Sequence, residues 1–249
     1  MIPGWTIPLL PIGVLALVGH LAHRADWGNP FLNILDGLNR LFCRYYHGLR
    51  REPVPLPEEG SALVVANHLS GLDPLLMIAA SPRPLHFIIA EEQYNRPGLR
   101  WLFRAGGCIP VERSRSPYRA LRAARRALER GEVVALFPQG RLLTAPERRG
   151  EQRPPIKPGI AWLAAGSGAP IHALHIQGVG GAGMTVAAVA VPSRARIHAC
   201  PPIRCAARSS GDGAGEPGPP QDTEGCLAAV RHCIEGGDTA AAGETTPRA

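Results

Sequence analysis

Lysine and aromatic residues are scarce in this sequence. The 27 basic residues include a single lysine, Lys157, and aromatic residues make up only 5% of the 249 positions. Proteins that bind single-stranded nucleic acid stack the bases on aromatic side chains. Because aromatics are few and no recognition motif is present, we expect no nucleic-acid partner. The net charge of +7 still favours an anionic partner, such as a phosphate group or an acidic lipid.

The sequence also lacks a C-x-x-C pair or any other spacing typical of a zinc site. A disulfide framework is typical of much smaller secreted chains. We therefore expect free thiols in a reducing compartment. His172 and His175 would point to opposite faces of a strand, which argues against a metal site there. We predict no metal and no prosthetic group. The six cysteines are Cys43, Cys108, Cys200, Cys205, Cys226 and Cys233.

Formal charge is absent from the first 23 residues, and residues 5–22 are almost wholly apolar. This run is near the lower limit of a membrane span, about 17–25 residues. Pro8, Pro11 and Gly13 argue against one straight helix. Arg24 follows the run and would keep the next domain on the cytoplasmic face of the cell membrane. We expect an anchor in or on the membrane, with a signal peptide or an ordinary buried helix as alternatives.

Apolar side chains in residues 30–51 recur at three- and four-residue steps, which predicts an amphipathic helix. Polar residues such as Asp36 and Arg40 fill much of its other face. The helix either docks on a core or lies in a lipid interface with its basic residues at the headgroups. We therefore predict that residues 1–51 form one membrane-associated helical segment.

Strand and helix signals alternate after residue 57. This alternation predicts an α/β domain over residues 52–207, with a largely parallel or mixed central sheet flanked by helices. Residues 208–249 are predicted to be a flexible tail with one short helix at 226–234. Strands are expected at 62–67, 85–90, 108–111, 133–137, 171–177, 184–191 and 194–200, and helices at 74–80, 98–105, 117–130 and 159–165.

The first polar motif is N-H-L-S-G-L-D at residues 67–73, between a buried strand and a helix. On a continuous helix His68 and Asp73 would lie about 140° apart, so they meet only if the chain turns at Ser70-Gly71. A histidine can take a proton from a hydroxyl near neutral pH, and a carboxylate on its other ring nitrogen orients it. Asp73-Pro74 is also a good helix start, so Asp73 can serve both purposes.

Two further motifs place polar residues at strand ends. The segment G-G-C-I-P-V-E-R at 106–113 presents Arg113, whose guanidinium can hold a phosphate. A solvated surface arginine is the alternative. The segment L-F-P-Q-G-R at 136–141 presents Gln139 and Arg141 at the carboxyl end of a strand, where ligands bind in α/β sheets. A plain polar turn is the alternative. Pro170 then leads into a last buried strand.

In this order, the motifs over residues 57–205 resemble the glycerolipid acyltransferase family, best known for its 1-acylglycerol-3-phosphate acyltransferases. The resemblance implies that His68 is the general base on an acceptor hydroxyl and that Asp73 is its orienting partner. It also implies acyl-CoA or acyl-carrier protein as the acyl-donor substrate, a lysophospholipid as the acceptor, and an N-terminal helical pair in the membrane. The implied substrate-binding residues are Asn67, Arg113, Phe137, Pro138, Gln139, Gly140 and Arg141.

The third motif departs from the family pattern F-P-E-G-T-R. Gln139 replaces the glutamate, Arg141 stands at the threonine, and Leu142 stands at the arginine. A glutamine keeps an acceptor oxygen but has no charge. Two alternatives follow, namely a different lyso-lipid acceptor and an inactive lipid-binding protein on the same fold. The sequence does not predict the oligomeric state.

Overall fold

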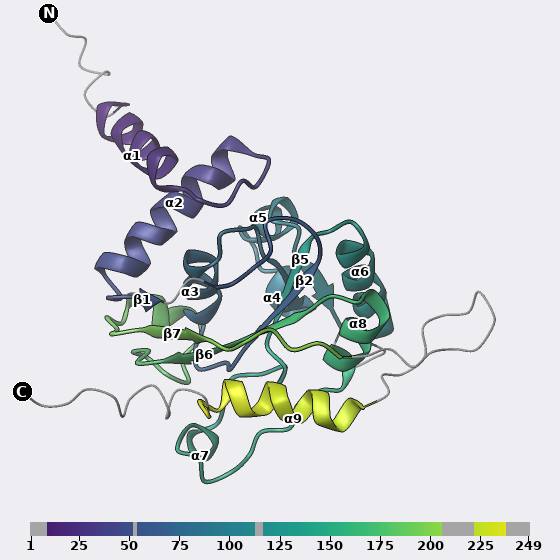
Figure 1. Ribbon diagram of the computed structural model, residues 1–249. Helices are drawn as coiled ribbons and strands as arrows, with labels where there is room; N and C mark the ends of the chain where they lie inside the picture. Colours follow the sequence, from purple (N-terminus) through teal and green to yellow (C-terminus); the bar gives the residue numbers. More distant parts are fainter. Residues whose placement is uncertain (1–8, 52–53, 113–116, 206–221, 238–249) are drawn as a thin grey trace, which may run out of the picture.

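The computed structural model describes residues 9–51, 54–112, 117–205 and 222–237 (Figure 1). The helices are α1 (Leu9–Ala22), α2 (Pro30–Tyr45), α3 (Asp73–Ala80), α4 (Glu91–Tyr94), α5 (Arg100–Ala105), α6 (Tyr118–Glu129), α7 (Ala145–Arg148), α8 (Gly159–Ser167), the 3-10 helix η1 (Val186–Ala190) and α9 (Thr223–Ile234). The strands are β1 (Arg50–Arg51), β2 (Ala62–Ala66), β3 (His86–Ala90), β4 (Ile109–Val111), β5 (Val133–Leu136), β6 (Ile171–Gln177) and β7 (Arg196–Ala199).

A seven-stranded sheet in the order β1-β7-β6-β2-β5-β3-β4 forms the centre of the molecule. β6 and β7 run antiparallel, and the other neighbouring strands run parallel. β2 and β5 are buried on both faces, which is why their sequences are unbroken apolar runs. The predicted sheet, largely parallel or mixed and flanked by helices, is confirmed.

Two hydrophobic clusters cover the opposite faces of the sheet. Leu63 and Val65 of β2 belong to the cluster that includes residues of α6, α8 and α9. Val64 and Ala66 belong to the cluster that includes residues of α3. Successive side chains of a strand alternate between the two faces of the sheet. The two residues that follow Ala66 therefore leave the strand on opposite faces. Asn67 continues the α9 side of the sheet, and the next residue continues the α3 side.

β2, β5 and β6 end at the same edge of the sheet. Val65 pairs with Leu136, and Ala66 pairs with Leu174. Because these strands are parallel, the segments that follow them leave the sheet side by side. The two motifs that the sequence places after β2 and β5 are therefore neighbours in space.

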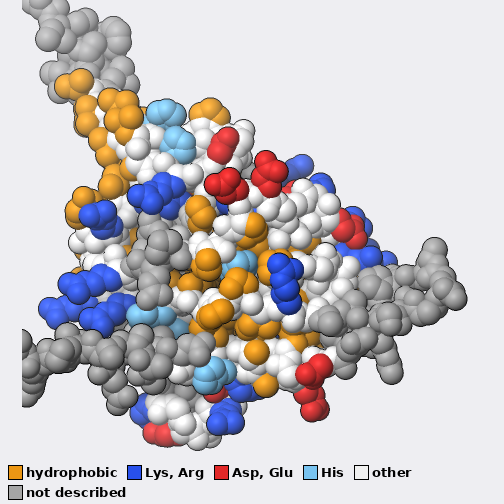
Figure 2. Space-filling view, in the orientation of Figure 1, with side chains coloured by type: hydrophobic (Ala, Val, Ile, Leu, Met, Phe, Trp, Pro, Cys, Tyr) orange, Lys and Arg blue, Asp and Glu red, His pale blue; other side chains and the backbone are white. Residues whose placement is uncertain are grey.

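α1 and α2 form a hairpin that projects from the sheet (Figure 1). The two helices approach closely, because a Cβ atom at Gly37 would lie 1.8 Å from the carbonyl oxygen of Gly19. Apolar side chains of α1 point outward, and Leu10 and Leu21 are each more than 70% exposed (Figure 2). Within the described part of the chain, none of the helices is both long and apolar enough to span a bilayer.

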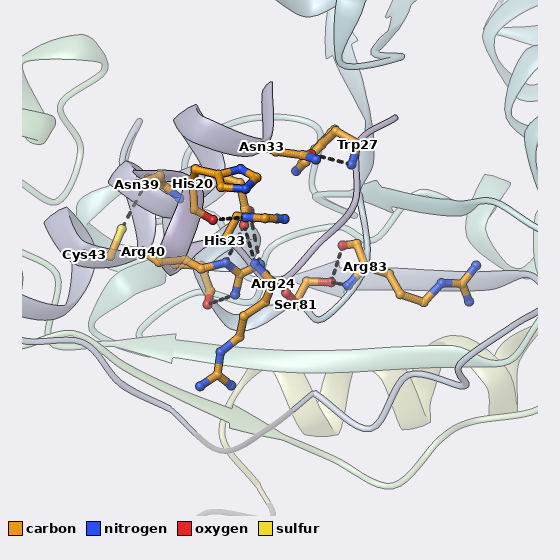
Figure 3. A network of polar contacts seen from close by, with 12 residues as sticks. His20, His23, Arg24, Trp27, Asn33, Asn39, Arg40, Cys43, Ser81 and Arg83 are labelled. Carbon is orange, nitrogen blue, oxygen red and sulfur yellow. Dashed lines mark hydrogen bonds and ion pairs between the residues drawn. The ribbon is translucent and has the colours of Figure 1, made fainter. Parts of the chain in front are cut away.

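A buried polar network joins α2 to the end of α3 (Figure 3). Arg40 donates to Asp36 from Nε at 2.6 Å, and donates to the carbonyl oxygens of Ala79 and Ser81 at 2.9 and 2.7 Å. The polar side of α2 therefore faces the α/β domain. The helix ends at Tyr45, short of the predicted Arg51.

The prediction of a strand at residues 184–191 is wrong. These residues include the 3-10 helix η1, and Ala188 is its buried residue. The segment contacts the turn after β2 instead of joining the sheet: the carbonyl oxygen of Met184 accepts a hydrogen bond from the Gly71 N–H at 3.0 Å. A short run of apolar residues does not by itself distinguish a strand from a helical turn.

The prediction of free thiols is wrong for four of the six cysteines. Disulfides join Cys200 to Cys233, 33 positions apart, and Cys205 to Cys226, 21 positions apart. They form because α9 folds back over the sheet and brings these cysteines together. Cys43 and Cys108 are free. The short helix predicted in the tail is confirmed as α9. The rest of the flexible tail predicted at 208–249 lies outside the described residues, except for residues 222–237.

Candidate active site

His68 and Asp73 meet at the carboxyl end of β2. The chain turns after Ala66 and returns to begin α3 at Asp73. His68 Nδ1 lies 2.9 Å from Asp73 Oδ2. The N–H groups of Leu69 and Ser70 donate to the same oxygen at 2.6 and 2.8 Å. The carboxylate thus holds the turn and the imidazole together.

The side chain of Asp73 is buried and extensively hydrogen-bonded. Its side chain is fully buried, and the Ser70 hydroxyl donates to Oδ1 at 3.2 Å. A buried carboxylate is tolerated only when hydrogen bonds compensate the loss of water, as they do here. Because His68 Nδ1 faces this carboxylate, the Nδ1–H donates and Nε2 of the neutral ring carries the lone pair. The His68 side chain is 19% exposed.

Phe137 fixes the plane of the His68 ring. The two rings are stacked, with centroids 3.8 Å apart and planes inclined by 9°. The pairing of β5 with β2 accounts for this contact, because Phe137 directly follows Leu136 in β5. The structure thus places Phe137, predicted as part of an acceptor-binding turn, against the imidazole itself.

The predicted turn at residues 137–140 is present. The Gly140 N–H donates to the Phe137 carbonyl at 2.9 Å, and Gly140 has a φ of 70°, which favours glycine. The carbonyl oxygen of Pro138 accepts a hydrogen bond from the N–H of Lys157 at 3.0 Å. Gln139 is buried, and its Oε1 has no hydrogen-bond partner among the described residues.

Asn67 ties β2 to β6. Its Oδ1 accepts from the N–H of Ile176 at 2.7 Å, and its Nδ2 donates to the carbonyl oxygen of the same residue at 2.8 Å. Both polar groups of the side chain are therefore engaged with the backbone. This arrangement fixes the end of β2 immediately before His68.

Of the two arginines predicted to bind substrate, Arg141 and Arg113, the structure describes only Arg141. Arg141 donates two hydrogen bonds to Glu147, at 2.6 and 2.7 Å. Chiefly through this pair, the pKa of Glu147 falls to about 2, so its carboxylate is charged at any physiological pH. The charge of Arg141 is thus compensated. Arg113 lies outside the described residues.

Sequence reasoning missed the segment that covers the turn after β2. Gly183 donates its N–H to the Leu69 carbonyl at 2.7 Å. A Cβ atom at Gly71 would lie 2.4 Å from the carbonyl oxygen of Thr185, so only glycine fits there. The glycine was visible in the sequence, but its partner is too distant along the chain to be inferred.

A cavity of about 670 Å³ adjoins this turn. It lies where the segments after β2, β5 and β6 meet the end of α9. Its lining includes Asn67, Leu69, Gln139, Arg148, Arg153 and Ile234. In the ranges that the structure describes, no group of three or more His, Cys, Asp or Glu side chains is placed to hold a metal ion.

Known proteins share both the motif region and the fold of this chain. A family model described as Acyltransferase matches residues 49–177, a range that includes His68, Asp73 and the turn at 137–141. The fold is similar to the crystal structure of the 1-acyl-sn-glycerophosphate (LPA) acyltransferase, PlsC, from Thermotoga maritima, with a TM-score of 0.58. The two chains are 19% identical, and the match covers 95% of this chain and 90% of that one. At this identity the likeness shows a shared fold.

Proposed function

Since this chain belongs to the acyltransferase family, we propose that it transfers a fatty acyl group from a thioester, acyl-CoA or acyl-carrier protein, to a hydroxyl of a lysophospholipid. The acceptor we propose is 1-acylglycerol-3-phosphate, the substrate type named for the Thermotoga maritima protein of the same fold. The observation that carries the proposal is the 2.9 Å contact between His68 Nδ1 and the fully buried carboxylate of Asp73.

The proposed reaction uses His68 as the base. The acceptor hydroxyl donates to Nε2, and its oxygen attacks the thioester carbonyl carbon as the proton moves to the ring. Asp73 stabilises the imidazolium that forms. The tetrahedral intermediate then collapses: the C–S bond breaks, and the departing thiolate takes the proton from His68. General-base assistance of this kind contributes about 10²–10⁴-fold.

An acyl-enzyme on Ser70 has no support. Its hydroxyl is fully buried and donates to Asp73 Oδ1 at 3.2 Å, while the same oxygen accepts the N–H of Leu72 at 3.1 Å. A nucleophile must reach the thioester carbon, and this hydroxyl is enclosed by the turn. We therefore propose direct transfer from thioester to acceptor.

We also propose that the enzyme works at the cell membrane. The exposed apolar side chains of α1 suit burial at the headgroup boundary (Figure 2). The position of Arg24 favours the cytoplasmic face, whereas paired cysteines are typical of oxidising compartments. Protease digestion of intact and permeabilised cells tests on which face of the membrane the domain lies. Protection of the domain in intact cells supports the cytoplasmic face, and its cleavage in intact cells contradicts that location.

Thiol release measured over a panel of lysophospholipids, with acyl-CoA and with acyl-carrier protein, tests the reaction. We expect release that depends on the acceptor and yields a diacyl product by mass spectrometry. Lysolipid binding without thiol release for any donor and acceptor would instead support the alternative, a non-catalytic lipid-binding protein. That alternative is motivated by Gln139, which has no charge where the family has a glutamate.

A further inference from the structure

The cavity beside the turn has the size of a ligand site. Its volume of about 670 Å³ falls within the range of about 300–1,000 Å³ typical of small-molecule pockets. Asn67 and Leu69 in its lining flank His68 in the chain, and the ring of His68 itself is not part of the lining. The end of α9 closes one side, and α9 is held to the rest of the domain by both disulfides.

The two carboxylates in the cavity lining are already compensated. Glu147 accepts two hydrogen bonds from Arg141, and Glu235 lies 3.5 Å from Arg231. Neither of these two arginines is part of the lining. The acidic groups therefore contribute little net negative charge to the cavity.

The two arginines in the lining, Arg148 and Arg153, are not compensated. Neither lies within ion-pair distance of a carboxylate in the described ranges of the chain. The balance of charge in the cavity is therefore positive, which favours an anionic ligand. A guanidinium presents several donors in a plane, and this geometry matches phosphate oxygens.

Arg148 is held in place close to His68. One of its terminal nitrogens, Nη1, donates to the carbonyl oxygen of Leu143 at 2.6 Å, and the Leu143 N–H donates to the carbonyl oxygen of His68 at 2.8 Å. Gly183 leaves room for the guanidinium, since a Cβ atom there would lie 3.1 Å from Nη1. The side chain uses one donor for positioning, and among the described residues the structure records no partner for the others.

The cavity wall also contains a buried acceptor without a partner. Gln139 is 5% exposed, and its Oε1 accepts no hydrogen bond from any residue that the structure describes. Leaving such a group unpaired is unfavourable, so a ligand that pairs with it gains affinity. A rotation of the terminal carboxamide would let a hydroxyl or amide of a bound ligand donate to it.

We propose that this cavity binds a phosphate ester through Arg148 and Arg153, with Gln139 accepting a hydrogen bond from a hydroxyl or amide of the same ligand. This assignment rests on the proposed acyl transfer and deepens it. The ligand chemistry has two sources among the substrates: the glycerol phosphate of the acceptor and the phosphopantetheine of the acyl donor. Arg148 and Arg153 take the phosphate role that Arg141, already paired with Glu147, does not fill.

Steady-state kinetics of Arg148→Gln and Arg153→Gln test the proposal. The matched control is Arg149→Gln, because Arg149 belongs to the same segment, is exposed and pairs with Glu151 outside the cavity lining. Each enzyme is assayed with 1-acylglycerol-3-phosphate and with phosphate-free monoacylglycerol as acceptor. Each is also assayed with acyl-CoA and with a phosphate-free acyl-pantetheine as donor. A melting curve for each variant verifies folding.

We expect each cavity variant to raise the KM of one phosphate-bearing substrate by about 10- to 100-fold, since a charge-assisted hydrogen bond contributes about 1.5–3 kcal/mol. The substrate affected identifies the source of the phosphate. The matching phosphate-free substrate should show no such change, and Arg149→Gln should behave like the wild type. Unchanged KM values for all substrates would overturn the assignment, as would an equal rise for the phosphate-free analogue.

A binding measurement separates this assignment from the proposed function. Calorimetric titration of wild-type protein with glycerol 3-phosphate and with CoA needs no turnover. Binding of either compound that Arg153→Gln weakens at least tenfold supports the site even if no acyl transfer is found. Arg153 is exposed, so its replacement leaves the fold intact. Binding that neither arginine variant weakens would reject the site while leaving the acyl transfer untouched.

Discussion

Replacing Asp73 by asparagine should remove catalysis while preserving the fold. The wild-type Oδ2 accepts three hydrogen bonds, from His68 Nδ1 and from the N–H groups of Leu69 and Ser70. The side-chain amide oxygen of the introduced asparagine can keep these three bonds, so the turn stays closed. The substitution removes the negative charge that stabilises the imidazolium in the transition state. We expect kcat to fall about 10²- to 10⁴-fold.

Replacing Asp73 by alanine should lower the stability of the fold as well as the activity, unlike the replacement by asparagine. It leaves two backbone N–H groups and the Ser70 hydroxyl without their acceptor inside a fully buried site. Each unsatisfied group costs about 1–3 kcal/mol, so the free energy of unfolding should fall by several kcal/mol as well. Asp73→Asn should therefore lose activity alone, and Asp73→Ala should lose activity and stability.

The assay pairs kcat from thiol release with the free energy of unfolding from urea titration. Ser70→Ala is the matched control, because it alters the same turn but leaves the charge and the His68 contact. We expect Ser70→Ala to retain kcat within about threefold, because the Ser70 hydroxyl takes no part in the proposed reaction. Wild-type kcat for Asp73→Asn, with an intact fold, would refute the role assigned to the carboxylate.

Three further predictions concern groups outside the turn. Burial lowers the pKa of His172, and neither of its ring nitrogens has a partner in the described ranges, so the folded protein binds its proton less readily than the unfolded chain. Its contribution to the free energy of unfolding should be complete above the unfolded pKa of about 6.5 and should fall as the pH drops below it. Urea titrations at several pH values should show that the free energy of unfolding falls less with decreasing pH in His172→Gln than in the wild type. The same dependence on pH in both proteins would contradict this. Removing the Cys200–Cys233 disulfide by paired alanine substitution should lower the free energy of unfolding by about 3–4 kcal/mol in the loop-entropy model, and an unchanged melting temperature would argue against the pairing. Burial raises the pKa of the Cys43 thiol to about 12 and that of Cys108 to about 11, so both should react slowly with a thiol reagent at about pH 8 in the native protein, and rapid labelling would contradict their burial.

Local sequence patterns predicted the strands and helices that build the proposed active site. β2 and β5 were predictable because strands buried on both faces are unbroken apolar runs. The His68–Asp73 contact was predictable because only a turn can bring residues five apart together here, and Ser70-Gly71 supplies it. Both inferences depend on short stretches of chain.

The features that sequence reasoning missed depend on distant residues. The disulfides form because α9 returns to the sheet, and the spacing of the cysteines gives no sign of that return. The two hydrogen bonds between Asn67 and Ile176 join strands that are far apart in the chain, so the sequence alone does not predict them. Arg148 and Arg153 stand among many arginines, and only the cavity separates them from solvated neighbours such as Arg149.

The most direct test of the central claim compares wild-type protein with His68→Ala in acyl transfer to 1-acylglycerol-3-phosphate. The variant removes the ring that faces Asp73 and Phe137 but leaves the backbone bonds of the turn in place. We predict that the wild type forms the diacyl product and that the folded variant forms it at least about 100-fold more slowly. Equal rates for the two proteins would contradict the assignment of His68 as the base.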